Sequence, residues 1–226
     1  MTLAAIENLN AKSGNTRKPP PVTGLSVKTA RRSVVGQCAE KVVKKPMTSR
    51  SPLRSQIKEA WRQSITDDYV AQRINSERSL QASVWSHLNG LLPSATRRMF
   101  IEPRMSVTGK DRQVRYPDIV VCNSRAVIGV IELKYQPRAQ PSWRKDIETF
   151  NWIATSKTLI TVSNVRFRGK SADVQTYPLT KDVLYVWAGV HAECNLHLVN
   201  FVGAELAPCF MELHAETRHS GTPRLR

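Results

Sequence analysis

The sequence contains no run of eighteen apolar residues, so no segment is expected to cross a membrane as a helix. An apolar core near the N-terminus is also missing, which argues against a secretory signal. The four cysteines are widely spaced and include no C-x-x-C pair, a pattern that predicts reduced thiols in a cytoplasmic protein. No G-x-x-x-x-G-K motif occurs, so the sequence does not support ATP-driven chemistry.

Acidic residues are scarce, because 18 Asp and Glu face 34 Lys and Arg, giving a formal net charge of +16 at pH 7. This excess predicts a polyanionic partner; nucleic acid is the first choice and an acidic membrane surface is the alternative. Residues 1–50 are rich in Lys, Arg, Ser and Pro and show no hydrophobic periodicity. We expect a flexible, disordered basic arm there that contacts phosphates without sequence preference, although a simple linker fits equally well.

Two apolar stretches, 119–122 and 126–131, are rich in Val and Ile and are separated by the polar residues 123–125. Apolar stretches of this kind joined by a short polar turn predict a β-hairpin. Asp118 precedes the first stretch and Glu132 follows the second. The hairpin should therefore bring both carboxylates to one end of the two strands.

Lys134 follows Glu132 by two residues, and residues two apart on a strand point to the same face. We expect two carboxylates and one ammonium to meet at the rim of an apolar sheet. Carboxylates suit Mg²⁺, with Mn²⁺ as an alternative, and such a metal activates water and neutralises charge on a phosphodiester. The ammonium would stabilise the negative transition state. The alternative interpretation is an ordinary hairpin with a surface Glu132–Lys134 pair.

These residues resemble the PD-(D/E)XK nuclease superfamily, which has the restriction-endonuclease-like fold. The match consists of Pro117-Asp118 and Glu132-Leu133-Lys134. The resemblance implies that Asp118, Glu132 and the backbone carbonyl of Leu133 bind the metal, while Lys134 acts on the attacking water. It also implies an α/β domain with a mixed sheet flanked by helices, which we expect over residues 51–210, with a polar tail over 211–226.

A helix is predicted over about 77–92, ended by Pro93. In the resembling family a helix before the core sheet often supplies another acid, which implies a catalytic role for Glu77. Gln81, one turn later, is a neighbouring candidate. The helix dipole alone also favours an acid at Glu77, so a purely structural role is the alternative. Glu102, on a strand predicted to pair with that of Asp118, is a further candidate for supporting the site.

Basic side chains cluster around the predicted hairpin and the strand before it. Near a metal site such side chains contact phosphates, although each one is also consistent with an ordinary solvated charge. Lys145, on a later helix, is open to the same two interpretations. The candidate nucleic-acid contacts are Arg97, Arg98, Arg104, Lys110, Arg112 and Arg115.

The rest of the chain should complete the mixed sheet. In the RecB-like exonuclease branch of the resembling family, the helix after the Glu132 strand carries a Gln and a Tyr four residues apart. The helix predicted over 142–156 has no such pair, so an endonuclease is preferred to an exonuclease. The spacing of His191, Cys194 and His197 offers only three zinc ligands, so no zinc site is predicted. The expected elements are a helix over 142–156, a strand over 158–162 parallel to the Glu132 strand, a surface loop over 163–182, and strands over 183–190 and 196–202.

The sequence therefore predicts a Mg²⁺-dependent nuclease that hydrolyses phosphodiester bonds, with DNA as the preferred partner. The alternative is a non-catalytic nucleic-acid-binding or assembly protein on the same fold, and a third option is a protein-binding accessory subunit. A homodimer or a partner subunit is compatible with either function. The resemblance also suggests a role in phage defence or in a mobile element.

Overall fold

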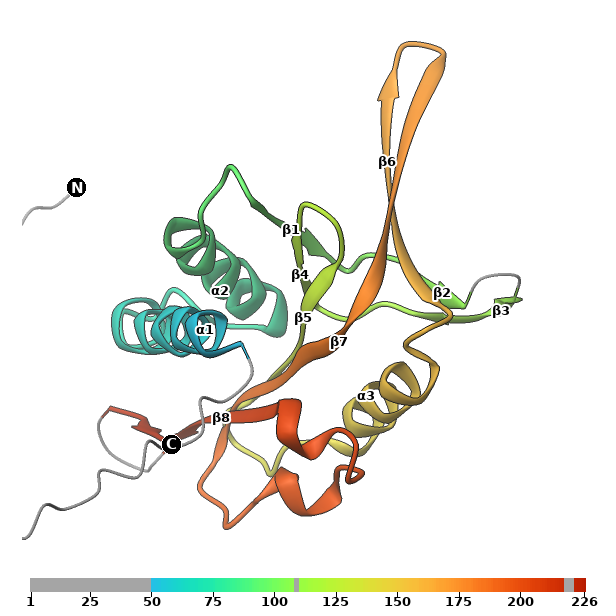
Figure 1. Cartoon of the computed structure of the whole chain (residues 1–226). Helices are drawn as coiled ribbons and strands as arrows, with labels where there is room; N and C mark the ends of the chain where they lie inside the picture. The colour runs from blue at the N-terminus through green and yellow to red at the C-terminus, as the bar shows by residue number, and fades with distance from the viewer. Residues whose placement is uncertain (1–49, 108–109, 218–221) are drawn as a thin grey trace, which may run out of the picture. The chain divides into compact units, whose positions relative to one another are not determined.

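The computed structural model describes residues 50–107, 110–217 and 222–226, and Figure 1 shows the arrangement of its helices and strands. The described part is an α/β unit in which helices flank a mixed, partly parallel sheet, so the predicted α/β class is confirmed. The basic arm predicted over residues 1–50 lies outside the described residues apart from Arg50. Within the described residues, no helix has the length and apolarity needed to cross a membrane.

One face of the sheet is covered by α1 (Ser51–Gln63), the short π-helix η1 (Ser64–Tyr69) and α2 (Glu77–Leu91). Ile57 and Trp61 lie one turn apart on α1, and both are buried against the sheet. This apolar stripe explains why the segment is a helix that packs by one side.

The start of α2 is fixed by a capping box. The hydroxyl of Ser76 accepts a hydrogen bond from the backbone N–H of Ser79, and the hydroxyl of Ser79 accepts one from the backbone N–H of Ser76. These bonds satisfy two backbone groups that a helix start leaves unpaired. The cap sets the position of Glu77, the first residue of the helix.

The predicted hairpin is formed by β4 (Ile119–Asn123) and β5 (Val127–Gln136), which pair antiparallel. The side-chain oxygen of Asn123 accepts hydrogen bonds from the backbone N–H groups of Arg125 and Ala126, each at 2.8 Å. An Asn that caps its own turn in this way favours a tight reversal. On its other side β4 pairs antiparallel with β1 (Arg97–Ile101), so the predicted pairing of the preceding strand with the Asp118 strand is confirmed, although Glu102 lies just beyond β1 and two further short strands separate β1 from β4 in sequence.

The parallel part of the sheet is built on the long strand β7 (Ser171–Ala192). Its second half runs parallel to β5 on one side and to β8 (Phe210–Thr217) on the other, and β9 (Arg224–Leu225) pairs with β8. The first half of β7 forms a separate hairpin with β6 (Ile160–Arg168), whose outer part extends away from the helices in Figure 1.

Two short strands complete the part of the sheet next to β6. They are β2 (Met105–Val107), which pairs with β6, and β3 (Lys110–Arg115), which pairs with β2. On the face opposite α1 and α2, the helix α3 (Arg144–Ser156) covers the sheet, close to the helix predicted over 142–156. The two faces carry separate apolar clusters, one under α1 and α2 and one under α3.

The predicted pairing of residues 158–162 with the Glu132 strand is wrong. The strand there, β6, pairs antiparallel with β7, and β7 itself takes the parallel position beside β5. The predicted loop over 163–182 is also wrong, because these residues form most of the β6–β7 hairpin. Val165 and Phe167 alternate there with Arg166 and Arg168 on a ribbon that lacks a buried face, so the segment resembles a polar loop in sequence.

Two further predictions for the C-terminal region are wrong. The strand predicted over 196–202 is a 3-10 helix, η2 (Leu198–Phe201), followed by a second one, η3 (Ala207–Cys209). The polar tail predicted over 211–226 begins instead with β8, most of whose residues are buried. Glu212, His214 and Glu216 give β8 its polar sequence, yet His214 and Glu216 lie inside the protein.

Candidate active site

Asp118 and Glu132 lie at the same end of the β4–β5 hairpin. Ile119 pairs with Ile131, so Asp118, which precedes Ile119, lies beside residues 132 and 133 of β5. The carboxylate of Asp118 accepts a hydrogen bond of 2.6 Å from the backbone N–H of Leu133. Glu132, which is 8 % exposed, lines the same cleft as Asp118. The hairpin therefore assembles the two carboxylates from residues that are distant in sequence.

Alternation along β5 separates Leu133 from its two charged neighbours. Leu133 is fully buried in the cluster under α1 and α2, whereas Glu132 and Lys134 line a cleft of about 610 Å³ on the α3 side. Because the N–H and C=O of one strand residue project to the same edge, the carbonyl of Leu133 is directed to the side on which Asp118 lies. The structure thus brings Asp118, Glu132, Lys134 and the Leu133 backbone together.

Glu77 reaches this cleft from the start of α2. One of its carboxylate oxygens lies 3.8 Å from the Lys134 Nζ, and the other accepts a hydrogen bond of 3.3 Å from the backbone N–H of Tyr135. Gln81 and Glu102 do not enter the cleft with their side-chain acceptors. Instead, the Gln81 amide (2.9 Å) and the Glu102 backbone N–H (3.0 Å) donate to the backbone carbonyl of Asp118 and fix its position.

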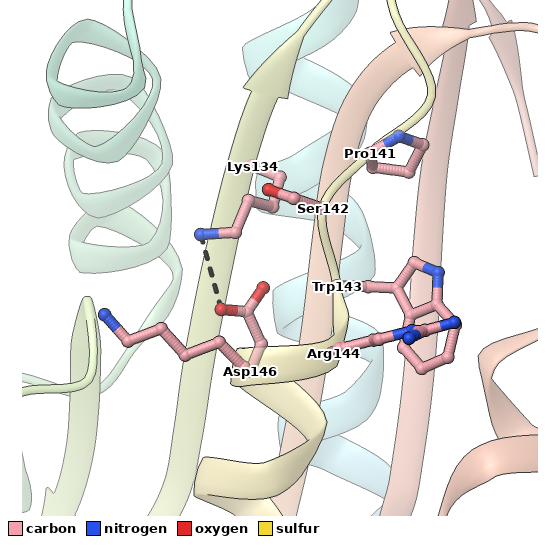
Figure 2. Close-up of a pocket in the computed structure, with 7 residues that line it drawn as sticks. Lys134, Pro141, Ser142, Trp143, Arg144 and Asp146 are labelled. Atoms are coloured by element: carbon pink, nitrogen blue, oxygen red, sulfur yellow. Dashed lines mark ion pairs between the residues drawn. The ribbon is translucent and has the colours of Figure 1, made fainter.

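Asp146, to which no sequence motif pointed, belongs to the same cluster. It lies in the first turn of α3, is 4 % exposed, and places one carboxylate oxygen 3.3 Å from the Lys134 Nζ (Figure 2). The signal that would have found it is its spacing. Asp146 precedes Phe150 by one turn, so it is an acid within the apolar stripe of the helix.

Trp187 on β7 holds the second oxygen of Asp146. Its indole Nε1 donates a hydrogen bond of 3.0 Å to that oxygen, and both groups are buried. The indole has space because the next residue on the same face of β7 is Gly189. A Cβ on Gly189 would lie 2.4 Å from the Cη2 atom of Trp187, so the ring lies directly against the glycine. The Trp187 indole on β7 therefore fixes the Asp146 carboxylate, and Asp146 in turn fixes the Lys134 ammonium.

Burial changes the protonation of the two hairpin acids. Removal from water raises the pKa of Asp118 to about 6, against the effect of the Leu133 N–H, and the charges of Glu77 and Asp146 add to the rise. Burial raises the pKa of Glu132 further, to about 9, with additional contributions from the charges of Asp118 and Asp146. Without a further cation, Glu132 is consequently protonated at neutral pH.

The acids have the opposite effect on Lys134. Burial alone would lower its pKa, but Asp146, Glu77 and Asp118 together raise the pKa above its ordinary value. The ammonium in turn opposes the rise that burial causes in the pKa of Asp146. Lys134 therefore keeps its positive charge in the cleft.

The donor set suits a hard divalent cation. Mg²⁺ in proteins usually takes one or two carboxylates and completes its shell with water and substrate phosphate oxygens. Burial disfavours the charged forms of the adjacent Asp118 and Glu132 carboxylates, and a bound cation would stabilise those charged forms. Across the described ranges, no three His, Cys, Asp or Glu side chains are already arranged as a complete ligand group.

The basic residues predicted to contact nucleic acid separate into two sets. Arg115 lines the cleft, as does Lys145, and the Arg115 guanidinium lies 5.3 Å from the ring centre of Trp152. Arg97 and Arg98 pair with Asn123 and Cys122 at the other end of β4, so the structure does not bring them to the cleft. Arg104 does not line the cleft either, and the side chains of Lys110 and Arg112 lie outside the described residues.

Of His191, Cys194 and His197, the structure brings the first two into contact, with the Cys194 Sγ 3.6 Å from the His191 Nδ1. His191 is buried and its Nε2 atom lies 2.9 Å from the Nδ1 atom of His214, while its Nδ1 atom donates to the carbonyl of Ala192. His197 is exposed and faces Arg226.

Comparison of the chain with protein-family models, with curated proteins and with solved structures found no match.

The raised pKa of Glu132 predicts how stability depends on pH when no divalent metal is present. Because the folded state holds this proton from an ordinary pKa of 4.5 up to about 9, the folded state binds more protons than the unfolded state over that interval. The free energy of unfolding should therefore fall as pH rises through the interval. Urea denaturation with chelator should show a shallower fall for Glu132→Gln than for the parent, and Glu205→Gln, which removes an exposed acid that does not line the cleft, is the control.

The contact between Gly189 and Trp187 predicts a destabilising substitution. Gly189→Ala should lower the free energy of unfolding by about 1–3 kcal/mol, because the added methyl overlaps the indole. Gly90→Ala is the matched control, since no atom lies within 4 Å of its Cβ position and Ala favours a helix. Chemical denaturation of both variants checks this, and equal stability of Gly189→Ala and the parent would show that the ring does not occupy this position.

Proposed function

We propose that the protein is a metal-dependent nuclease that hydrolyses phosphodiester bonds, with DNA as its substrate, on a restriction-endonuclease-like fold. The observation that carries the proposal is the convergence of Asp118, Glu132 and Lys134 in one cleft at the end of a β-hairpin. A mixed sheet with helices on both faces supports the same fold assignment. The PD-(D/E)XK resemblance of these residues adds to this support.

The metal would be held by the carboxylates of Asp118 and Glu132 and the backbone carbonyl of Leu133. When bound, Mg²⁺ would lower the pKa of a water molecule and neutralise charge on the phosphodiester. Its affinity depends on losing the proton of Glu132, so binding should strengthen as pH rises. Glu77 lines the same cleft, and it would support the cluster through its contact with the Lys134 ammonium.

Lys134 would act as a fixed positive charge. Because neighbouring acids raise its pKa, the side chain holds its proton and does not serve as the general base. Its ammonium instead stabilises the negative charge that develops on the phosphate and orients the attacking water. The proton of that water passes to a carboxylate of the cleft. Asp146 and Trp187 are positioning residues, since Asp146 pairs with Lys134 and Trp187 donates to Asp146.

The charge of the chain supports a nucleic-acid substrate. A formal net charge of +16 attracts a polyanion, and Arg115 and Lys145 stand at the walls of the acidic cleft. Such side chains contact the phosphates on either side of a scissile bond. The acids of the cleft, in contrast, would repel a phosphate until a cation binds.

Substitution of the hairpin acids tests the function. Supercoiled, linear and single-stranded DNA are incubated with Mg²⁺, with Mn²⁺ and with chelator. Asp118→Asn and Glu132→Gln should lower the cleavage rate by about 100-fold or more, because each removes a metal ligand. Asp173→Asn, on the distant β6–β7 hairpin, is the control. Cleavage by Asp118→Asn or Glu132→Gln at the parental rate would refute the proposal, and metal-independent, salt-sensitive binding without cleavage would establish the non-catalytic alternative.

Disruption of the support for Lys134 should reduce activity without removing the metal ligands. Asp146→Asn removes one of the charges that raise the pKa of Lys134, so the alkaline limb of the pH–rate profile should move to lower pH. Trp187→Phe removes the donor to Asp146 and should lower the rate by about 10-fold or more. A lower rate for Asp146→Asn with an unmoved pH profile would mean that Asp146 does not act through Lys134.

A further inference from the structure

A second cavity lies on the other side of the Lys134–Asp146 ion pair from the acidic cleft. It has a volume of about 400 Å³ and lies at the start of α3, where Figure 2 shows the side chains of Trp143 and Arg144 extending to the side away from the ion pair. Lys134 and Asp146 line both this cavity and the cleft, so the ion pair forms the wall between them. The cavity and the cleft are therefore adjacent, and Lys145 lines both of them as well.

Among the described residues, Trp143 is the one aromatic side chain that lines the cavity; it is half-buried, and Phe201 packs beside it. The rings of Trp143 and Phe201 have their centres 4.4 Å apart, and the guanidinium of Arg144 lies 5.8 Å from the Trp143 ring centre. Phe201 is 52 % exposed although it is a large apolar side chain. Aromatic rings accessible in this way stack with planar ligands such as nucleobases.

The charge of the cavity is opposite to that of the cleft. Lys134, Arg144 and Lys145 line it, and its only lining acid among the described residues is Asp146. Asp146 is already engaged by Lys134 and Trp187. The cleft, in contrast, is lined by several carboxylates. The cleft accordingly suits a cation and the cavity suits an anion.

We propose that this cavity is a nucleotide subsite that binds the unpaired nucleotide next to the bond in the acidic cleft. Trp143 stacks with its base, and Arg144 and Lys145 contact the phosphates on either side of it. Lys145 lines both spaces, so it lies where the strand passes from one to the other. A base must be unpaired to present its face to a protein ring, so the substrate is single-stranded or frayed at this point. The proposal rests on the nuclease function proposed above.

Binding measured apart from cleavage tests the subsite. Fluorescence anisotropy of a short labelled single-stranded DNA is recorded with chelator, so no strand is cut. Trp143→Ala should weaken binding by about 10-fold because base stacking is lost, and Trp143→Phe should weaken it less. The double variant Arg144→Ala/Lys145→Ala should reduce the slope of log K against log salt by about 1.4, roughly 0.7 for each phosphate contact on a single strand.

Two control variants match these changes. Lys58→Ala removes an exposed cation from α1, on the opposite face of the sheet, and Phe167→Ala removes an exposed aromatic side chain from β6. Both should bind as the parent does, except that Lys58→Ala can change the salt slope slightly through net charge. Thermal denaturation shows whether Trp143→Ala folds, and the double variant carries the test if it does not, because both of its side chains are exposed.

The outcomes separate this subsite from the nuclease function. Parental affinity and salt slope in the folded Trp143 and Arg144/Lys145 variants would overturn the subsite, even if Glu132→Gln abolishes cleavage as expected. Binding that depends on Trp143 but is accompanied by no metal-dependent cleavage would instead overturn the nuclease function and leave a nucleic-acid-binding cavity. Weaker binding of Trp143→Ala together with parental-like binding of Glu132→Gln would support both proposals.

Discussion

The positive charge of Lys134 is the constraint on which the site depends. Its ammonium lies 3.3 Å from Asp146 and 3.8 Å from Glu77, and its side chain is only 18 % exposed. Several carboxylates that share a poorly solvated space destabilise a protein unless a cation compensates them. Asp146 holds that cation and is itself held by Trp187, so β5, α3 and β7 must all be in place before Lys134 is positioned. The site is therefore a property of the packed sheet and not of the hairpin alone.

The hairpin could be predicted from sequence because its determinants are local. Alternation with a period of two, β-branched residues and a turn that Asn123 caps with its own side chain all act within a few residues. The same alternation places Glu132 and Lys134 on one side and Leu133 on the other. The position of Glu77 also follows from a local signal, the Ser76–Ser79 capping box at the start of α2.

The remaining parts of the site depend on contacts that local patterns do not encode. Asp146 and Trp187 are 41 residues apart, and each has an ordinary local role, as a first-turn acid and as a buried aromatic residue. Their pairing follows from the parallel alignment of β5 with β7, which the sequence pattern assigned to 158–162 instead. The strand β7 is difficult to identify because one half belongs to an exposed ribbon and the other half to the buried sheet. A single strand in two environments has no uniform hydrophobic period.

The charges of the cleft and of the neighbouring cavity also explain why metal and nucleic acid would bind as a coupled pair. With its acids ionised and no cation present, the cleft repels a phosphate, whereas protonation of Glu132 removes repulsion but also removes a metal ligand. A divalent cation removes the repulsion and keeps the ligand. A phosphodiester that is also held by Arg144 and Lys145 in the cavity would add oxygen ligands to that cation. Each partner thus lowers the electrostatic cost of binding the other, and the buried Lys134–Asp146 pair keeps the two opposite charges in separate spaces.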